Sequence, residues 1–331
     1  MKNIVKVISF FCILTVCLLF FSNTLQASVA NTSTSRNQVN QSIKSEFNNS
    51  LDVLFMGDST ILNSVVPIDI WKHIGVTSFS VGYGWAKPSE LYYDYKKILK
   101  TQSPKYLFLE SSILVNSVKN DKYLINKSTN FINYLDDEIY GQFNTLFPIM
   151  KYKSSLKDGH IIDIFKSKPK ELRNIYKGYS FKNKIVDTRE QETENTLEDL
   201  GYIDNSETYI KKLNKLCIKN NCQLILVLMP QKCDWSMTKH KLVENLANRL
   251  NISFIDYNVD TEKKIVGFNW DTDSADGGYH LNYTGAKKTT IAMEQYLANT
   301  LKIKPTALTA EQKKRWNEDS ELFYRFISDN S

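Results

Sequence analysis

The stretch "LDVLFMGDST", residues 51–60, joins a short, continuous apolar run to Gly57, Asp58 and Ser59. A run of this kind is typical of a strand that is buried on both faces of a parallel sheet. Glycine permits a sharp turn where the strand ends, and the residues after it could begin a helix. Backbone N–H groups at a helix start can stabilise a developing oxyanion, so Ser59 is a candidate nucleophile.

Four further segments have the composition of strands, and they alternate with segments whose apolar residues recur at helical spacing. The expected strands are 76–81, 105–110, 223–229 and 252–257, and the expected helices are 88–101, 207–220, 237–250 and 285–302. This alternation predicts an α/β fold, in which a parallel sheet is flanked by helices. We expect one such domain over 51–302, followed within 303–331 by a C-terminal helix that Thr309 caps.

Residues 115–205 interrupt this alternation. The segment is rich in Tyr, Phe, Lys and Asn, and it is too long for a plain loop. We interpret it as an irregular insertion that covers the sheet edge where a ligand would bind.

The first 50 residues differ from the rest of the chain. An apolar run over 8–21 follows two lysines, which favours a signal peptide or membrane anchor over 1–27, with small residues that permit cleavage after Ala27 or Ala30. Residues 28–50 are rich in Ser, Thr, Asn and Gln, as a flexible tether would be. Both alternatives place the bulk of the chain outside the cytoplasm, either anchored at the cell surface or secreted.

Charge and cysteine content exclude some classes of function. The formal net charge of +6 is spread along the chain, without the basic blocks that indicate nucleic-acid binding. The five cysteines lack zinc-site spacing, and we expect neither a metal nor a cofactor. Cys217 and Cys222 could form a disulfide or remain free thiols, and both alternatives stay open.

His280 is the candidate base for Ser59. A serine nucleophile needs a base, usually a histidine that a carboxylate orients. His280 lies in "DSADGGYHLNYTGAKK", residues 273–288, a polar loop that precedes the last helix of the domain. A loop histidine beside acidic residues suits this role. The other three histidines, His73, His160 and His240, are interpreted as structural or solvent-facing.

The "GDS" that follows the first strand and the "HLNYTG" that opens the last helix resemble, together, the SGNH (GDSL-type) hydrolase superfamily. The resemblance covers 51–302 without the insertion. It implies a flavodoxin-like sheet and serine-dependent acyl chemistry. Residue by residue, it implies that Ser59 is the nucleophile, that His280 is the base, and that the N–H groups of Ser59 and Gly82 form the oxyanion hole.

Two features depart from the superfamily's pattern. The aspartate usually stands three residues before the histidine, but Gly277 occupies that position here. Asp276 is therefore the expected orienting acid, and Asp273 is held in reserve. The Gly-x-Asn-Asp block that often follows the third strand is also missing. Asn116 is a weak substitute, and we assign no third oxyanion donor.

Within the superfamily, the apolar N-terminus together with "PKYLFLE", "YKGYSF" and "HLNYTGAKK" resembles the branch that modifies cell-surface polymers. The resemblance implies an O-acetyltransferase or acetylesterase acting on a cell-surface or secreted polysaccharide. It also implies a membrane-bound O-acyltransferase as partner. One alternative is D-alanyl transfer to teichoic acid, with Glu110 facing the ammonium group. Another is a catalytically inactive protein that binds or assembles glycans.

Aromatic residues in the expected connections could contact sugar rings. We name Trp85 and Trp270, together with Asn282, as candidate substrate contacts, and we give Trp235 less weight. The alternative for each tryptophan is a place in the core, because aromatic side chains bury a large apolar area.

Overall fold

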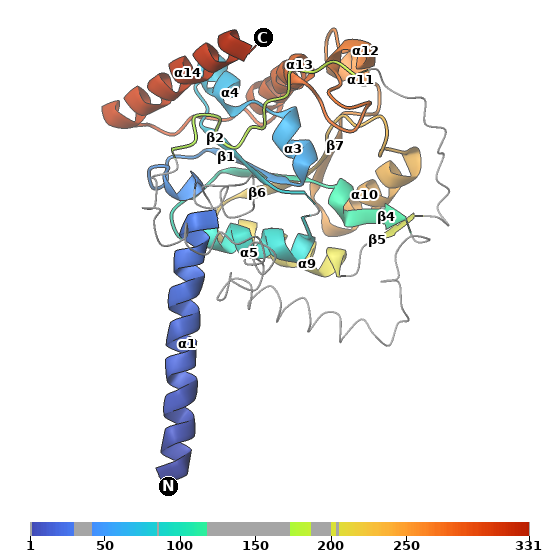
Figure 1. The fold of residues 1–331 in the computed structure, drawn as a ribbon. Helices are drawn as coiled ribbons and strands as arrows, with labels where there is room; N and C mark the ends of the chain where they lie inside the picture. The colour runs from blue at the N-terminus through green and yellow to red at the C-terminus, as the bar shows by residue number, and fades with distance from the viewer. Residues whose placement is uncertain are drawn as a thin grey trace.

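The computed structural model describes residues 2–29, 42–84, 86–117, 173–186, 200–202 and 205–330. Its centre is a five-stranded sheet with the strand order β2-β1-β3-β6-β7 (Figure 1). All neighbouring strands run parallel. The strands are β1 (Val53–Gly57), β2 (Ser78–Gly82), β3 (Tyr106–Glu110), β6 (Gln223–Leu228) and β7 (Ser253–Asp256). The predicted α/β fold is therefore confirmed.

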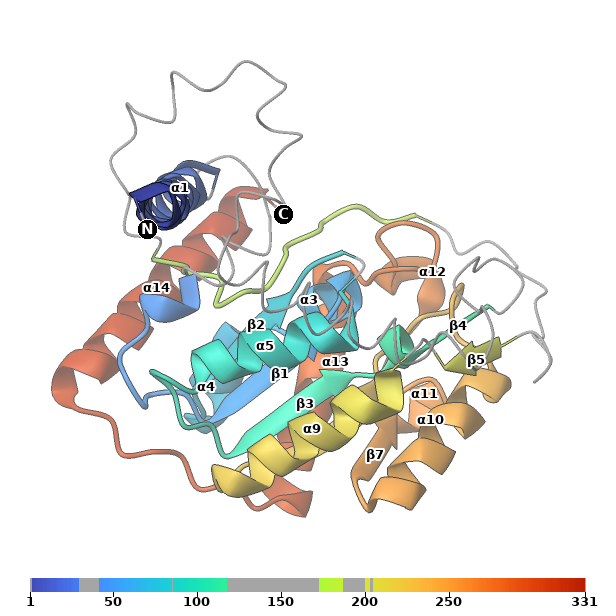
Figure 2. The same ribbon diagram turned by 90° about the horizontal axis from the view of Figure 1, so that it is seen from below.

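Helices cover both faces of this sheet (Figure 1). Helices α5 (Pro88–Ile98) and α9 (Ser206–Lys219) lie side by side on one face, as Figure 2 shows from below. The other face carries α3 (Ser59–Ser64), α4 (Pro67–Ile74) and α13 (Tyr283–Gln295), and α10 (Met237–Leu250) packs against β7. Short turns of helix complete the domain: η1 (Ser112–Leu114), α11 (Thr261–Lys264), α12 (Trp270–Asp273) and η3 (Tyr296–Thr300).

Both faces of strand β1 are buried, which explains its continuously apolar sequence. Leu54 and Met56 pack in one core cluster with residues of α5 and α9. Val53 and Phe55 point to the opposite face and pack in a second cluster with residues of α3 and α13. Successive side chains of a strand alternate between faces, and both faces are covered here, so polar residues have no solvated side to occupy.

The N-terminal helix α1 (Lys2–Val29) extends away from the α/β domain (Figure 1). Between residues 4 and 20 it exposes apolar side chains, including Ile4, Phe10 and Val16. Within the described residues, no helix has both the length and the apolar character needed to cross a membrane. The signal or anchor over 1–27 stays a prediction.

Part of the expected tether is packed against the domain. Ile43 is buried in the core, and the buried carboxylate of Glu46 forms an ion pair with Lys177 at 2.7 Å. The flexible tether predicted over 28–50 is therefore wrong for its end, residues 42–50. The segment is mostly polar, so its sequence did not indicate that Ile43 and Glu46 pack against the domain in the folded chain.

The described parts of the predicted insertion hold no helix. β4 (Val115–Ser117) and β5 (Leu200–Tyr202) form a small antiparallel pair at its two ends. Between them, residues 173–186, here called the strap, run beside the outer strand β2. The carbonyl of Lys177 accepts a hydrogen bond from Ser80 N–H at 2.9 Å. Gly178 has φ +86°, and a Cβ there would collide with the Ser80 carbonyl, so only glycine allows this approach.

The C-terminal helix α14 (Ala310–Asn330) follows Thr309, whose hydroxyl accepts a hydrogen bond from Gln312 N–H at 3.2 Å. Its apolar face lies against α4 and buries Trp316 and Phe323. Helix α14 and the strap are joined by charge as well, because the buried ammonium of Lys177 contacts the carboxylate of Asp319 at 2.7 Å.

Candidate active site

Ser59 stands where β1 gives way to α3. Asp58 is the N-cap of α3, and its Oδ1 accepts a hydrogen bond from Thr60 N–H at 2.8 Å. Ser59 is therefore the first helical residue. The N–H of a first helical residue has no acceptor within its own helix. Ser59 thus presents a hydroxyl and a backbone donor at the carboxyl end of the sheet, where α/β proteins bind ligands.

His280 lies at the end of a tight loop. An isolated bridge pairs Ser274 with Leu281 and closes the loop. Gly277 and Gly278 have φ values of +81° and +101°, in the left-handed region that glycine adopts without strain. The two glycines fold the chain back, so the Asp276 carboxylate reaches the imidazole of His280.

Three side chains form one hydrogen-bonded series. Ser59 Oγ lies 2.8 Å from His280 Nε2. His280 Nδ1 lies 2.5 Å from Asp276 Oδ2, and Asp276 Oδ1 accepts a second hydrogen bond from the backbone N–H of His280 at 2.8 Å. The carboxylate thereby fixes both the loop and the ring. This is the arrangement of nucleophile, base and orienting acid that nucleophilic catalysis by serine requires.

Asp276 stays ionised in this setting. Partial burial alone would raise the pKa of its carboxyl, but the hydrogen bonds from His280 and the ammonium of Lys182 hold the pKa below its usual value. Lys182 Nζ lies 3.1 Å from Asp276 Oδ2. The reserve candidate, Asp273, is fully buried and paired with Lys288 at 2.8 Å. Of the two aspartates, only Asp276 contacts the histidine.

Gly82 ends β2 beside the turn that leads from β1 to Ser59. In the register of the sheet it pairs with Gly57. A Cβ on Gly82 would lie 2.6 Å from the Asp58 carbonyl oxygen and 2.9 Å from that of Gly57. The absence of a side chain therefore lets the end of β2 approach the turn that carries Ser59, as the predicted oxyanion hole requires.

Glu110, at the end of β3, lies beneath this turn and is fully buried. Its Oε2 accepts hydrogen bonds from the N–H and the hydroxyl of Ser112. Burial, and then the nearby charge of Asp58, raise the pKa of Glu110 to about 8. The D-alanyl alternative, in which Glu110 faces the substrate ammonium, gains no support from this buried position. The next residue, Ser111, also uses its backbone within the fold, because its N–H donates to the Val227 carbonyl.

The structure places the predicted substrate contacts unequally. Trp270 is partly buried and packs edge-to-face on Phe268, with 4.9 Å between ring centroids. Asn282 is only 2% exposed and caps α13, with its Oδ1 accepting from Gly285 N–H at 3.1 Å. Its predicted contact with substrate is therefore wrong, because the folded chain uses the amide internally. Trp85 lies outside the described residues.

Two residues that the sequence did not single out support the site. Gln231 Nε2 donates to Thr60 Oγ1 at 2.8 Å and so links the loop after β6 to α3. Cys233 Sγ donates to the Gly277 carbonyl at 2.7 Å, next to the turn that presents Asp276. Neither residue belongs to a periodic pattern or motif, so no signal in the sequence could have found them.

The other cysteines and histidines of the α/β domain that the structure describes, apart from Cys233, do not belong to this series. Cys217 and Cys222 are buried free thiols rather than a disulfide. His73 pairs with Glu294 at 2.9 Å, and His240 pairs with Asp256 at 2.8 Å. His160 falls outside the described residues. In the described part of the chain, no group of three or more His, Cys, Asp or Glu side chains could hold a metal ion.

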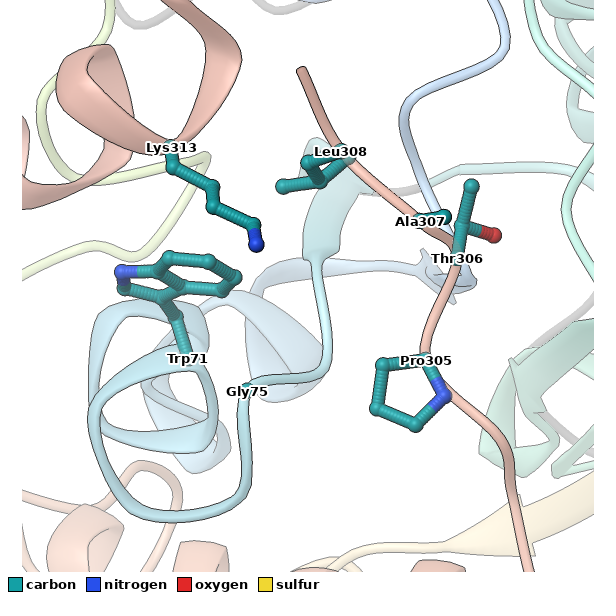
Figure 3. A pocket seen from close by; sticks show the side chains of 7 residues that line it. All are labelled: Trp71, Gly75, Pro305, Thr306, Ala307, Leu308 and Lys313. Carbon is teal, nitrogen blue, oxygen red and sulfur yellow. The ribbon is translucent and has the colours of Figure 1, made fainter. Parts of the chain in front are cut away.

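A separate pocket lies between α4 and the segment that leads into α14. Figure 3 shows Trp71 and Lys313 facing this hollow, with Pro305 and Leu308 on its opposite wall. It has a volume of about 410 Å³. None of its lining residues belongs to the series of Ser59, His280 and Asp276, so this pocket is not the candidate active site.

No family model and no curated protein matches the chain. Several solved structures are similar to it. One is described as an acylhydrolase from Bacteroides fragilis, with 15% identity, coverage of 82% of this chain and 98% of that one, and a TM-score of 0.39. A GDSL-like lipase from Bacteroides thetaiotaomicron has 12% identity, coverage of 76% and 89%, and a TM-score of 0.35. An acetylxylan esterase from Geobacillus stearothermophilus has 9% identity, coverage of 80% and 100%, and a TM-score of 0.35.

Proposed function

We propose that this chain is a serine-dependent acyl-transfer enzyme of the SGNH (GDSL) type, acting as an O-acetyltransferase or acetylesterase on a cell-surface or secreted polysaccharide. The observation that carries the proposal is the series from Ser59 Oγ through the His280 ring to the Asp276 carboxylate. Gly82 lies beside it at the carboxyl edge of the sheet. The choice of a polysaccharide as acceptor and of acetyl as the acyl group rests on the sequence resemblance.

In the first half-reaction, Ser59 Oγ attacks the carbonyl carbon of the acyl donor while His280 Nε2 takes the hydroxyl proton. The N–H groups of Ser59 and Gly82 stabilise the oxyanion that forms. The carbon–oxygen bond to the leaving alcohol then breaks, and His280 returns its proton to that alcohol. The Asp276 carboxylate holds the ring and stabilises the transient imidazolium.

In the second half-reaction, a hydroxyl attacks the acyl carbon on Ser59 while His280 takes its proton. The bond between that carbon and Ser59 Oγ then breaks, and His280 returns the proton to Ser59 Oγ. If the hydroxyl belongs to a sugar, the acyl group is transferred. If it belongs to water, the ester is hydrolysed. The two outcomes share every residue named so far, so the site supports acyl chemistry in general.

Two observations weigh on the alternative functions. A protein that kept Ser59 only as a helix cap would not need a histidine at its hydroxyl, and the cap of α3 is Asp58. The inactive glycan-binding alternative is thus disfavoured. D-alanyl transfer loses its support from Glu110, because that carboxyl is fully buried.

The location and the partners belong to the same proposal. We place the catalytic domain outside the cytoplasm, held to the membrane through the N-terminal segment or released from it. A membrane-bound O-acyltransferase would deliver the acyl group, and the polysaccharide would accept it. The apolar composition of residues 8–21 supports this arrangement.

Acyl trapping tests the proposed chemistry. The full chain, kept in solution with a mild detergent, is incubated with p-nitrophenyl acetate, quenched in acid and mapped by peptide mass spectrometry. We expect an acetyl group on Ser59 that is absent from Ser59→Ala and strongly reduced in His280→Gln. A folded wild-type chain that neither forms this adduct nor hydrolyses the ester would overturn the proposal. Added oligosaccharides then separate transfer from hydrolysis.

A further inference from the structure

The strap, residues 173–186, joins the two halves of the candidate active site. On one side, Ser180 N–H donates to the Leu62 carbonyl at 2.8 Å, and the Asn63 amide donates to the Ser180 carbonyl at 2.6 Å. Both partners belong to α3, the helix that begins with Ser59. This end of the strap is therefore fixed to the nucleophile's own helix.

On the other side, the strap is tied to the elements that carry His280. The carbonyl of Lys182 accepts from Tyr283 N–H at 2.7 Å, and Val186 N–H donates to the Ser274 carbonyl at 3.1 Å. The ring of Phe181 packs on that of Tyr283, with 5.7 Å between centroids. Hydrogen bonds on both sides thus hold the backbone of Lys182 in place between α3 and the loop of residues 273–282.

The Lys182 side chain uses this position to reach the carboxylate that orients the base. Its ammonium lies 3.1 Å from Asp276 Oδ2, the same oxygen that contacts His280 Nδ1. The pair is partly exposed, with 32% of the Lys182 side chain and 36% of the Asp276 side chain accessible. Among the described residues, Asp276, on the same loop, and Asp58, at the cap of α3, interact electrostatically with His280. Lys182 brings the opposing charge from the strap.

We propose that Lys182 is a positioning residue for the acyl-transfer reaction, which holds the Asp276 carboxylate oriented toward His280 and thereby affects the pH dependence of the rate. The inference rests on the proposed function, in which these two residues orient and transfer the proton. An ammonium that shares the carboxylate oxygen weakens the attraction between that carboxylate and the imidazolium. Removing the Lys182 charge should therefore change how the reaction rate depends on pH.

The test compares four forms of the full chain: wild type, Lys182→Met, Lys182→Arg and Lys184→Met. Methionine keeps the length of the side chain without its charge, and arginine keeps the charge. Lys184, exposed on the same strap, is the matched control. The first readout is kcat/KM for p-nitrophenyl acetate between pH 5 and pH 9. The second is the pH titration of the His280 ring signal by NMR, assigned with His280→Gln.

We expect Lys182→Met to move the acidic limb of the rate profile, and the midpoint of the ring titration, upward by about half a unit to one unit. Arginine at position 182 and methionine at position 184 should leave both near wild type. A merely structural role for Lys182 would lower the rate at every pH and leave the limb and midpoint unchanged, and that result would overturn the inference.

The two proposals fail in different ways. A folded wild-type chain without Ser59-dependent ester hydrolysis would overturn the proposed function, whatever the Lys182 variants do. An active wild type whose limb and titration midpoint are indifferent to Lys182→Met would overturn only the role of Lys182. If Lys182→Met does not fold, Lys182→Gln gives the same comparison with a polar side chain.

Discussion

Nε2 of His280 lies 2.8 Å from Oγ of Ser59, although 221 residues separate them in the chain. The contact follows from the topology. Ser59 begins α3 at the carboxyl end of the inner strand β1, and α13, which starts just after His280, packs beside α3. The carboxyl ends of parallel strands meet at one edge of the sheet, so residues distant in sequence converge there.

Asp276→Asn tests whether Asp276, rather than Asp273, is the acid that orients His280. The amide cannot stabilise the imidazolium, so kcat for ester hydrolysis should fall by about 10²–10⁴-fold while the protein stays folded. Asp273→Asn is the matched control. It breaks the buried contact with Lys288 at 2.8 Å and should cost about 1–3 kcal/mol of unfolding free energy, with much less effect on kcat. Steady-state kinetics and urea unfolding of both variants provide the measurement, and a reversed pattern would reassign the acid to Asp273.

Gly82→Ala should damage the site through backbone geometry. The new Cβ would lie 2.6 Å from the Asp58 carbonyl oxygen, so the turn that carries Ser59 must shift. A displacement of this kind at a reacting group costs about 10²-fold in kcat/KM. Gly84→Ala, two residues on, places its Cβ in open space and should behave as wild type. Equal activity of the two variants would contradict the proposed role of Gly82 in the oxyanion hole.

Glu110 should make stability depend on pH. Its pKa is about 8 in the folded chain and about 4.5 when exposed, so between these values the folded state binds more protons than the unfolded state. Stability should therefore fall as pH rises from 5 to 9, by at most about 4 kcal/mol. Glu110→Gln cannot ionise and should flatten this dependence, becoming the more stable protein at pH 9. Urea unfolding of both proteins at the two pH values decides it, and parallel curves would contradict the assignment.

Phe323→Ala should weaken the attachment of α14. Phe323 is fully buried against the domain, and its removal leaves a cavity that should cost about 3–5 kcal/mol. Leu322, its neighbour on the same helix, is 40% exposed, and Leu322→Ala should cost less than about 1 kcal/mol. Thermal unfolding of the two variants gives the comparison. Similar losses from both would mean that α14 does not pack as described.

Some residues of the candidate site could be predicted from the sequence, and others became evident only in the folded structure. Ser59 and His280 could be predicted because Ser59 directly follows a recognisable strand and His280 directly precedes a recognisable helix. Their side chains are also the usual nucleophile and base of serine-dependent catalysis. Asn282 shared the same motif and led to a wrong prediction. Its amide caps α13, a local use that competes with any role toward a ligand.

By itself, the sequence determined the parallel sheet, because strands covered on both faces are mostly apolar, and the run of β1 is apolar throughout. It also predicted Ser59 and His280 as a pair, and the folded chain brings Ser59 Oγ to 2.8 Å from His280 Nε2. Only the tertiary structure decided that Asp276 rather than Asp273 orients His280, since two glycines with positive φ fold the loop back on itself. Only the tertiary structure showed that Lys182 contacts Asp276. The strap has no periodic pattern, and the contact depends on how the chain crosses the edge of the sheet.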